Sequence, residues 1–425
     1  MQGDAAHGHF IPLSIAEVKR QLFDSDLPEA AESAGLARVC ELIEALYHHR
    51  LHDRLKRLKA SYERLDPSAS TLDMSQAEGF LSLFESLLED GNWKAVGDAE
   101  LQAALEGEDV FPISLEVPFE EFVQMRLFKL GQSPVTDTPK QALIHRVLRR
   151  PAETRMVDVY DRVVMAIQFQ SKEWFEENGI PKRYPGDRAR GLHLRLFASI
   201  PKLDLEVIFP NTKPMMKVSD KIKIIAPLIG GLVSLGMKFG PVLLGADQAG
   251  DTSLSLLGGI LAALGSYMLK SYLKFRKTKE EYLIAVSQDL FFKGQANDEA
   301  VIMSILDLAE SQEVKEAIIA YTFLLREADA GHDQTSLDAQ IEQWLAERDA
   351  KVDFEVDDAL GKLLELGLLT RGKTNDDGRL AWDGEEWVDA ERGAIGSSEA
   401  IGAVPVKAAL VQLDSIWDDL YAFEE

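Results

Sequence analysis

The chain has 425 residues, which is long enough for two or three domains with cores of their own. Its formal net charge of −25 disfavours a nucleic-acid role, because phosphate binding needs a basic surface. The single cysteine, Cys40, excludes an intramolecular disulfide, and we interpret it as a small buried helix residue rather than a nucleophile.

Residues 1–110 are predicted to be a helical region. Apolar residues recur at helical spacing over 37–65, up to the Asp66-Pro67 break, and further helices are predicted at 75–88 and 98–105. His48 and His52 lie four residues apart, a spacing that could hold a metal ion. No third ligand is fixed nearby, so we prefer solvated helix surface and predict no metal site.

Residues 111–220 are predicted to be an α+β domain of a few strands covered by helices. The strongest strand candidates, at 158–169 and 192–200, are rich in β-branched and aromatic residues. Residues 113–119 alternate between apolar and polar. Short helices are expected at 119–130 and 171–178.

Two apolar stretches, 222–245 and 252–275, predict a two-helix transmembrane hairpin over residues 221–277. Lysines and an arginine flank both outer ends, whereas the connecting loop is acidic, so the positive-inside rule places both termini in the cytoplasm. Lys238 can extend its charge to the interface, and Gly236, Gly240 and Gly258 belong to small-residue rows that permit close helix packing. The alternative is a buried helical hairpin inside a soluble protein.

The C-terminal region is predicted to contain a helical hairpin at 278–330, with helices at 298–310 and 311–327. Helices at 336–348 and 355–366, followed by a strand hairpin turning at 375–378, resemble a winged helix within residues 331–390. The would-be recognition helix sets a lone Lys362 against five acidic residues, which favours a structural or protein-contact role over DNA binding: Asp353, Glu355, Asp357, Asp358 and Glu365. A small-residue linker at 393–403 and a last helix at 405–421 complete residues 391–425.

A search for reaction chemistry finds no phosphate-binding glycine loop, no dinucleotide fingerprint and no nucleophile elbow. We therefore predict no cofactor and assign no catalytic residue. Asp204 and Glu206, beside Lys202, are two residues apart, and this spacing pairs them on neither a strand nor a helix. A helix start with balanced surface charge is the preferred interpretation.

Two segments carry a family resemblance. Residues 197–213 read Phe-Ala-Ser-Ile-Pro-Lys-Leu-Asp-Leu-Glu-Val-Ile-Phe-Pro-Asn-Thr-Lys, and residues 274–282 read Lys-Phe-Arg-Lys-Thr-Lys-Glu-Glu-Tyr. Together they resemble the signatures of the transmembrane protein 143-like family, whose shared domain is named only as one of unknown function. The signature positions are Ile200, Pro201, Asp204, Leu205, Glu206, Phe209, Pro210, Lys213, Phe275, Arg276 and Tyr282. The resemblance implies a membrane protein and brings no assigned reaction, and the absence of an organellar presequence predicts a bacterial member.

The sequence thus predicts a mostly helical α+β protein with a transmembrane hairpin. Its leading functional hypothesis is a non-enzymatic interaction or scaffold protein at the bacterial inner membrane, with the lipid bilayer and other proteins or a second copy as partners. Lys238 and the glycine rows motivate an alternative, an oligomeric channel or transport component. A membrane-tethered hydrolase using Asp204, Glu206 or His193 is a further alternative.

Overall fold

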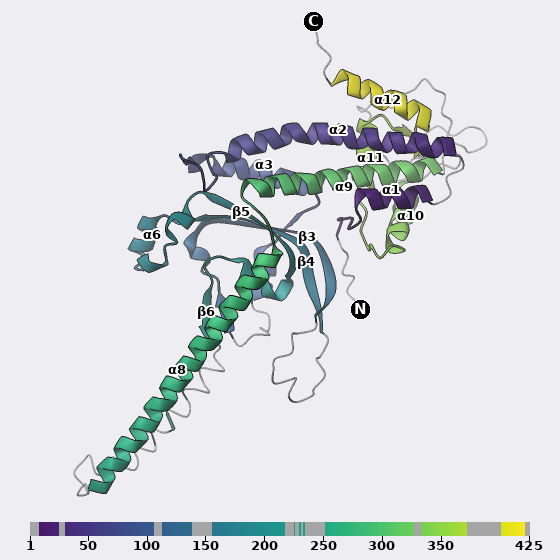
Figure 1. Cartoon of the computed structure of the whole chain (residues 1–425). Coiled ribbons are helices and arrows are strands. Elements are labelled where there is room, and N and C mark those ends of the chain that lie inside the picture. The colour runs from purple at the N-terminus through teal and green to yellow at the C-terminus, as the bar shows by residue number, and fades with distance from the viewer. Residues whose placement is uncertain are drawn as a thin grey trace. The chain divides into compact units, whose positions relative to one another are not determined.

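The computed structural model describes residues 8–24, 30–105, 113–137, 155–216, 251–326, 333–371 and 401–420, with isolated positions at 225, 229, 230 and 233. The chain is a mixed helix-and-sheet protein that divides into two compact units (Figure 1). Unit 1 comprises Met1–Val96, Phe122–Ser199 and Gln295–Glu425, and unit 2 comprises Gly97–Glu121 and Ile200–Gly294. Each unit is built from segments that are far apart in the sequence.

Unit 1 is built around a five-stranded sheet of order β1-β3-β4-β5-β7. Its strands are β1 (Lys94–Ala95), β3 (Phe122–Asp137), β4 (Arg155–Phe169), β5 (Leu192–Pro201) and β7 (Gly294–Asn297). The long antiparallel pair β3–β4 forms its centre and runs in register from Phe122 opposite Phe169 to Asp137 opposite Arg155, with one irregularity near Gln124. The β-branched and aromatic residues of β4 favour this extended pairing.

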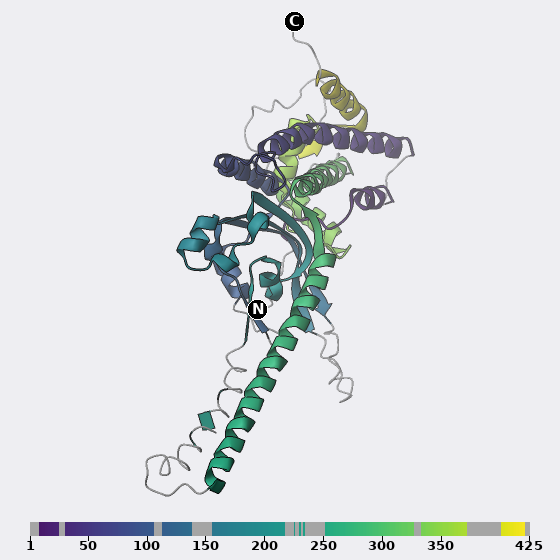
Figure 2. The same cartoon turned by 60° about the vertical axis from the view of Figure 1, so that its left-hand side comes forward.

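Helices cover one face of this sheet. The helices of unit 1 are α1 (Ile15–Asp24), α2 (Ala30–Tyr62), α3 (Ala77–Asp90), α6 (Lys172–Glu177), α9 (Glu299–Arg326), α10 (Gln334–Ala346), α11 (Val356–Glu365) and α12 (Val406–Asp419). The two long helices α2 and α9 lie side by side in both views (Figures 1 and 2). Short strands β8 (Leu369–Arg371) and β9 (Ile401–Ala403) pair antiparallel beside them.

The core of unit 1 has two clusters, and α2 and α9 contribute to both. One cluster joins α2, α3 and α9 to the sheet through Phe80, Phe84 and Leu194, all of which are fully or almost fully buried. The other joins α1, α10, α11 and α12 to the remaining halves of α2 and α9, and it contains Cys40. Burial raises the pKa of the Cys40 thiol to about 12, so the expected interpretation of this cysteine as a buried helix residue is confirmed.

Unit 2 contains α4 (Asp98–Leu105), β2 (Ile113–Glu116), the 3₁₀ segment η5 (Lys202–Ile208), β6 (Lys213–Met216) and α8 (Asp251–Lys293). Strands β2 and β6 pair antiparallel, with Glu116 opposite Lys213. The rings of Phe119 and Phe209 meet edge-on at 5.7 Å between centroids. Leu101 and Ala104 of α4 and Leu205 and Ile208 of η5 are buried, and these two elements contact each other.

The expected transmembrane hairpin is wrong. No helix in the described part of the chain is both long enough and apolar enough to cross a membrane. The first expected span lies almost wholly outside the described residues, together with Lys238, Gly236 and Gly240. The second, with Gly258, is the beginning of the 43-residue helix α8. The same finding contradicts the predicted two-span location in the bacterial inner membrane.

Three element predictions also differ from the structure. Residues 119–130 fit a helical pattern, but the segment from Phe122 pairs with β4 as strand β3, because cross-strand partners override the local pattern. The predicted break at Ser311 does not occur, and α9 runs through it as one helix. The end of the predicted linker at 393–403 is strand β9, whereas the turn expected at 375–378 lies outside the described residues.

Candidate functional sites

Helix α8 carries a continuous stripe of exposed side chains. At about 100° per residue, nine positions fall within roughly 120° of the helix circumference. They are Leu269, Tyr272, Leu273, Arg276, Glu280, Leu283, Ile284, Ser287 and Phe291, and all nine are exposed. We call this set the α8 stripe.

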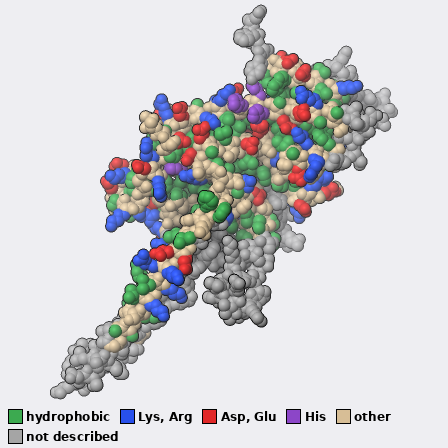
Figure 3. Space-filling view, in the orientation of Figure 1, with side chains coloured by type: hydrophobic (Ala, Val, Ile, Leu, Met, Phe, Trp, Pro, Cys, Tyr) green, Lys and Arg blue, Asp and Glu red, His purple; other side chains and the backbone are tan. Residues whose placement is uncertain are grey.

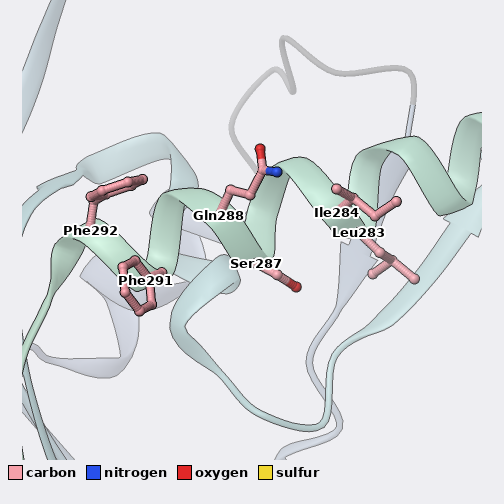
Figure 4. A pocket seen from close by; sticks show the side chains of 6 residues that line it. All are labelled: Leu283, Ile284, Ser287, Gln288, Phe291 and Phe292. Carbon is pink, nitrogen blue, oxygen red and sulfur yellow. The ribbon is translucent and has the colours of Figure 1, made fainter.

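The α8 stripe is apolar at both ends and charged in its middle. Leu269 and Phe291 are 59% and 79% exposed, which is unusual for side chains of this size. Hydrophobic side chains appear on α8 on either side of a band of basic and acidic ones (Figure 3). Leu283, Ser287 and Phe291 project from one side of the helix and line a shallow depression with Ile284, Gln288 and Phe292, which project from the adjacent side (Figure 4).

The charged middle of the stripe is one ion pair. Arg276 and Glu280 lie four residues apart, with 3.2 Å between their nitrogen and oxygen atoms. Lys277 and Glu281 repeat the arrangement at 3.7 Å on the neighbouring face of the helix. Such exposed pairs add only about 0.3–0.5 kcal/mol each to the helix, so their stabilising effect is small. Their chemical consequence is a fixed pattern of positive and negative charge between two apolar patches.

Unit 1 contains a buried charged network centred on Lys362 of α11. Its ammonium group contacts Glu316, lies 2.6 Å from Asp358 and lies 3.1 Å from Glu313. Asn92 donates a hydrogen bond of 2.8 Å to the other oxygen of Glu316. Burial alone would lower the pKa of Lys362, but the three carboxylates outweigh it and raise that pKa.

For two carboxylates of this network, burial outweighs the attraction of the lysine. Burial raises the pKa of Glu313 to about 7, against the attraction of Lys362. Burial also raises the pKa of Glu316. This network joins α9, α11 and the turn that follows α3, which are distant from one another in sequence. Strongly shifted pKa values are common at functional sites and also arise in structural ion pairs.

A neighbouring set of polar groups on α9 holds the N-terminal segment. Gln312 exchanges two hydrogen bonds with the backbone of Ile11, at 3.1 and 3.3 Å. Lys315 donates to the carbonyl oxygens of Ile11 and Leu13, and its ammonium lies 5.4 Å from the centre of the Phe10 ring. Burial lowers the pKa of Lys315 to about 7. These contacts explain why a lysine that is 2% exposed is tolerated here.

An acidic cleft of about 700 Å³ opens beside the Lys362 network. Seven of its lining residues are carboxylates: Glu89, Asp90, Glu313, Asp338, Glu355, Asp357 and Asp358. Partial burial and nearby carboxylates raise the pKa of Asp338 to about 6. Asp357 and Asp358 lie in the first turn of α11, where negative charge stabilises a helix N-terminus. This helix-end role accounts for part of the acidity without a ligand.

The signature positions named from the sequence all lie in unit 2, and most of them have a structural role. Leu205, Glu206 and Phe209 are buried, and Ile200 and Pro201 lie at the end of β5. Lys213 begins β6. Pro210 follows η5, and the Asp204 side chain lies outside the described residues. Phe275, Arg276 and Tyr282 belong to α8, and among them Arg276 lies on the α8 stripe.

His193, named in the hydrolase alternative, lies on β5 in unit 1. Its Nδ1 is 3.9 Å from Asp298, and its ring meets Phe169 edge-on. Burial lowers its pKa, and its Nε2 has no hydrogen-bond partner among the described residues. A histidine that activates a nucleophile needs a hydroxyl or thiol within hydrogen-bond reach. The described surroundings of His193 supply none at Nε2.

His48 and His52 of α2 lie on a solvated surface. Their rings stack at 6.4 Å, and Nδ1 of His48 is 3.1 Å from Glu310. No group of three or more histidine, cysteine or acidic side chains in the described residues could hold a metal ion. The sequence missed the Lys362 network because its partners come from distant segments, although an apolar run containing Glu313, Lys315 and Glu316 was visible.

The comparison with family models covers the central third of the chain. Residues 160–300 match the model of a family described as a protein of unknown function (DUF3754). Over these residues the chain is similar to that family. The matched stretch includes β5, η5 and α8, and therefore every signature position named from the sequence. No solved structure matches the chain. The resemblance to the transmembrane protein 143-like family stays a prediction, because the matching description names no such relative.

Proposed function

We propose that this chain is an interaction protein that binds another protein through the α8 stripe. The observation that carries the proposal is the exposure of large apolar side chains in two patches on one face of a single helix. Contiguous apolar patches on a surface are typical of protein–protein contacts, whereas scattered apolar residues are not. A helix with such a face is a common recognition element in its own right.

The energetics support a bound state for this face. Fully burying one leucine, isoleucine or phenylalanine side chain is worth about 1.5–3 kcal/mol. The stripe offers six large apolar or aromatic side chains, namely Leu269, Tyr272, Leu273, Leu283, Ile284 and Phe291. Their combined burial exceeds the lower estimates of the entropic cost of association, about 4–15 kcal/mol. Aromatic residues such as Tyr272 and Phe291 are also enriched at interfaces.

The charged middle of the stripe supports selectivity. A partner must place opposite charges against Arg276 and Glu280 while it covers the two apolar patches. A partner without matching charges would bury Arg276 or Glu280 against an unsuitable surface, which costs about 3–5 kcal/mol for an unpaired charge and weakens binding. The stripe therefore favours a partner of matching pattern over general hydrophobic adhesion.

Photo-crosslinking from α8 tests the proposal. The full chain is expressed with p-benzoylphenylalanine at Tyr272, which lies on the stripe, or at Tyr267, which lies roughly 140° away on the same helix. Both changes replace one aromatic side chain with another, so they are matched. We expect a crosslinked protein adduct from position 272 and much less from position 267. Equal adduct yields, or no adduct from position 272, would contradict the proposal.

A further inference from the structure

The α8 stripe is nearly symmetric about position 278. Two positions of the helix are related in this way when their numbers add to 556. This rule pairs Arg276 with Glu280, Leu273 with Leu283, and Tyr272 with Ile284. It also pairs Leu269 with Ser287, and Phe291 with Gly265. From Tyr272 to Ile284 the stripe therefore has the same pattern when it is read in either direction, with the sign of the central charge reversed, whereas the two outer pairs each join a large side chain to a small one.

From this pattern we propose that the partner of the α8 stripe is a second copy of this chain, bound with the two α8 helices antiparallel. This inference rests on the proposed function and names the occupant of the same surface. A two-fold axis through position 278 places each Arg276 opposite the Glu280 of the other copy. The same patch is then used on both subunits, as the symmetry of a closed dimer requires.

The charge pattern selects the antiparallel arrangement. In a parallel pair Arg276 would lie opposite Arg276, and Glu280 opposite Glu280. Like charges opposed in this way cost several kcal/mol in other interfaces. In the antiparallel pair the intrahelical ion pairs of the two copies, each 3.2 Å long, lie against one another and form a ring of four alternating charges.

The apolar flanks fit the same arrangement. Leu273 and Tyr272 of one copy cover Leu283 and Ile284 of the other, so both apolar patches are buried at once. Gly265 is exposed, and a Cβ atom built there would meet nothing within 4 Å. It therefore leaves room for the Phe291 ring of the second copy. Packed helices lie about 8–10 Å apart between axes, depending on the side chains at the contact.

Charge reversal tests this pairing with the full chain. In a homodimer of R276E, glutamates face each other at both central contacts. In a homodimer of E280R, arginines face each other at both contacts. We expect each variant alone to dimerise at least about tenfold more weakly than wild type, measured by analytical ultracentrifugation. A one-to-one mixture of the two variants restores opposite charges at both contacts. The mixture is therefore expected to form a heterodimer with wild-type affinity.

The control variant is E281R, which makes the same substitution one residue further along. It breaks an equivalent intrahelical pair with Lys277, but it lies roughly 120° from the centre of the stripe. It should dimerise like wild type. Failure of the mixture to associate, or equal weakening in E281R, would overturn the antiparallel pairing. If the chain stays monomeric while position 272 crosslinks to a different protein, the proposed self-association is wrong and the proposed function stands.

Discussion

Lys362 and the three carboxylates around it form a charged centre inside unit 1. Taking these groups out of water is costly, and their mutual attraction offsets that cost only because each has a specific partner. Glu313 carries the clearest consequence, because its pKa of about 7 lies well above its ordinary value of 4.5. Between pH 4.5 and about pH 7, the folded protein therefore holds a proton at Glu313 that the unfolded chain has released.

The sign of the resulting pH dependence follows from this difference. Glu313 contributes stability that is fully present below pH 4.5 and is lost as the pH rises through 7. Glu313→Gln cannot ionise, so the variant should lose less stability between pH 5 and pH 8, by on the order of 1–3 kcal/mol. Urea unfolding across this pH range measures the difference.

Glu347→Gln is the matched control for this prediction, because its side chain is 61% exposed at the end of α10. Its unfolding curves should follow the wild-type pH dependence. If Glu313→Gln and the wild type lose stability in parallel from pH 5 to pH 8, the carboxyl of Glu313 does not hold the proton assigned to it.

The individual residues of this network could not be identified from the sequence. Lys362 stands there as one cation among acids on a short helix, a pattern typical of a solvated surface. Lys362 is buried because Glu313 and Glu316 of α9 contact it. Glu316 precedes Lys362 by 46 residues in the sequence. Cys40 was predicted well, since its burial depends on the local helical spacing of its neighbours.

At the scale of elements, the junction between α2 and β5 depends on one glycine. Gly191 has a φ of +74°, and a Cβ atom there would lie 2.5 Å from the carbonyl oxygen of Leu65. The same oxygen accepts a hydrogen bond from the Leu192 amide, and the Tyr62 hydroxyl donates to the Leu192 carbonyl. The end of α2 and the start of β5 thus meet backbone to backbone.

Gly191→Ala should therefore destabilise unit 1 by about 1–3 kcal/mol from the left-handed backbone alone, with the backbone clash adding to it. Gly361→Ala, in α11, is the control, because its Cβ atom meets open space and glycine weakens a helix by about 0.5–1 kcal/mol. We expect denaturant midpoints to fall for the first variant and to rise slightly for the second. Similar midpoints for the two would contradict this account of the junction.

Elements with strong local signals were predicted from the sequence. Strands β4 and β5 are confirmed close to their predicted bounds, as are α3, α4, α6, α10, α11 and α12. The structure adds an N-cap to α6, where the Ser171 hydroxyl accepts a hydrogen bond from the Trp174 amide. Strand β3 was predicted as a helix because its apolar spacing fits both periods, and only its pairing with β4 decides between them.

At the scale of the whole molecule, the sequence predicted a membrane hairpin from an apolar run between basic flanks. The structure places the second half of that run at the start of α8, which continues into the paired charges Arg276–Glu280 and Lys277–Glu281. The two units could not be derived from the sequence either. Each draws on separate segments, and their boundaries at Val96, Phe122 and Ser199 carry no linker composition.

The central claim is that the α8 stripe is covered by another protein chain. Cysteine protection in cells tests it most directly, because the native Cys40 is fully buried and its pKa is raised to about 12, which leaves it unreactive. Ser287→Cys places a thiol on the stripe, between Leu283 and Phe291, with little change in shape. Glu281→Cys places one on the same helix outside the stripe. Each maleimide labelling rate is normalised to the rate in urea.

We expect the thiol at position 287 to label several-fold more slowly than the thiol at position 281 in cells that express the full chain. Equal normalised rates at the two positions would contradict the claim, because a face covered by another chain would protect the thiol at position 287.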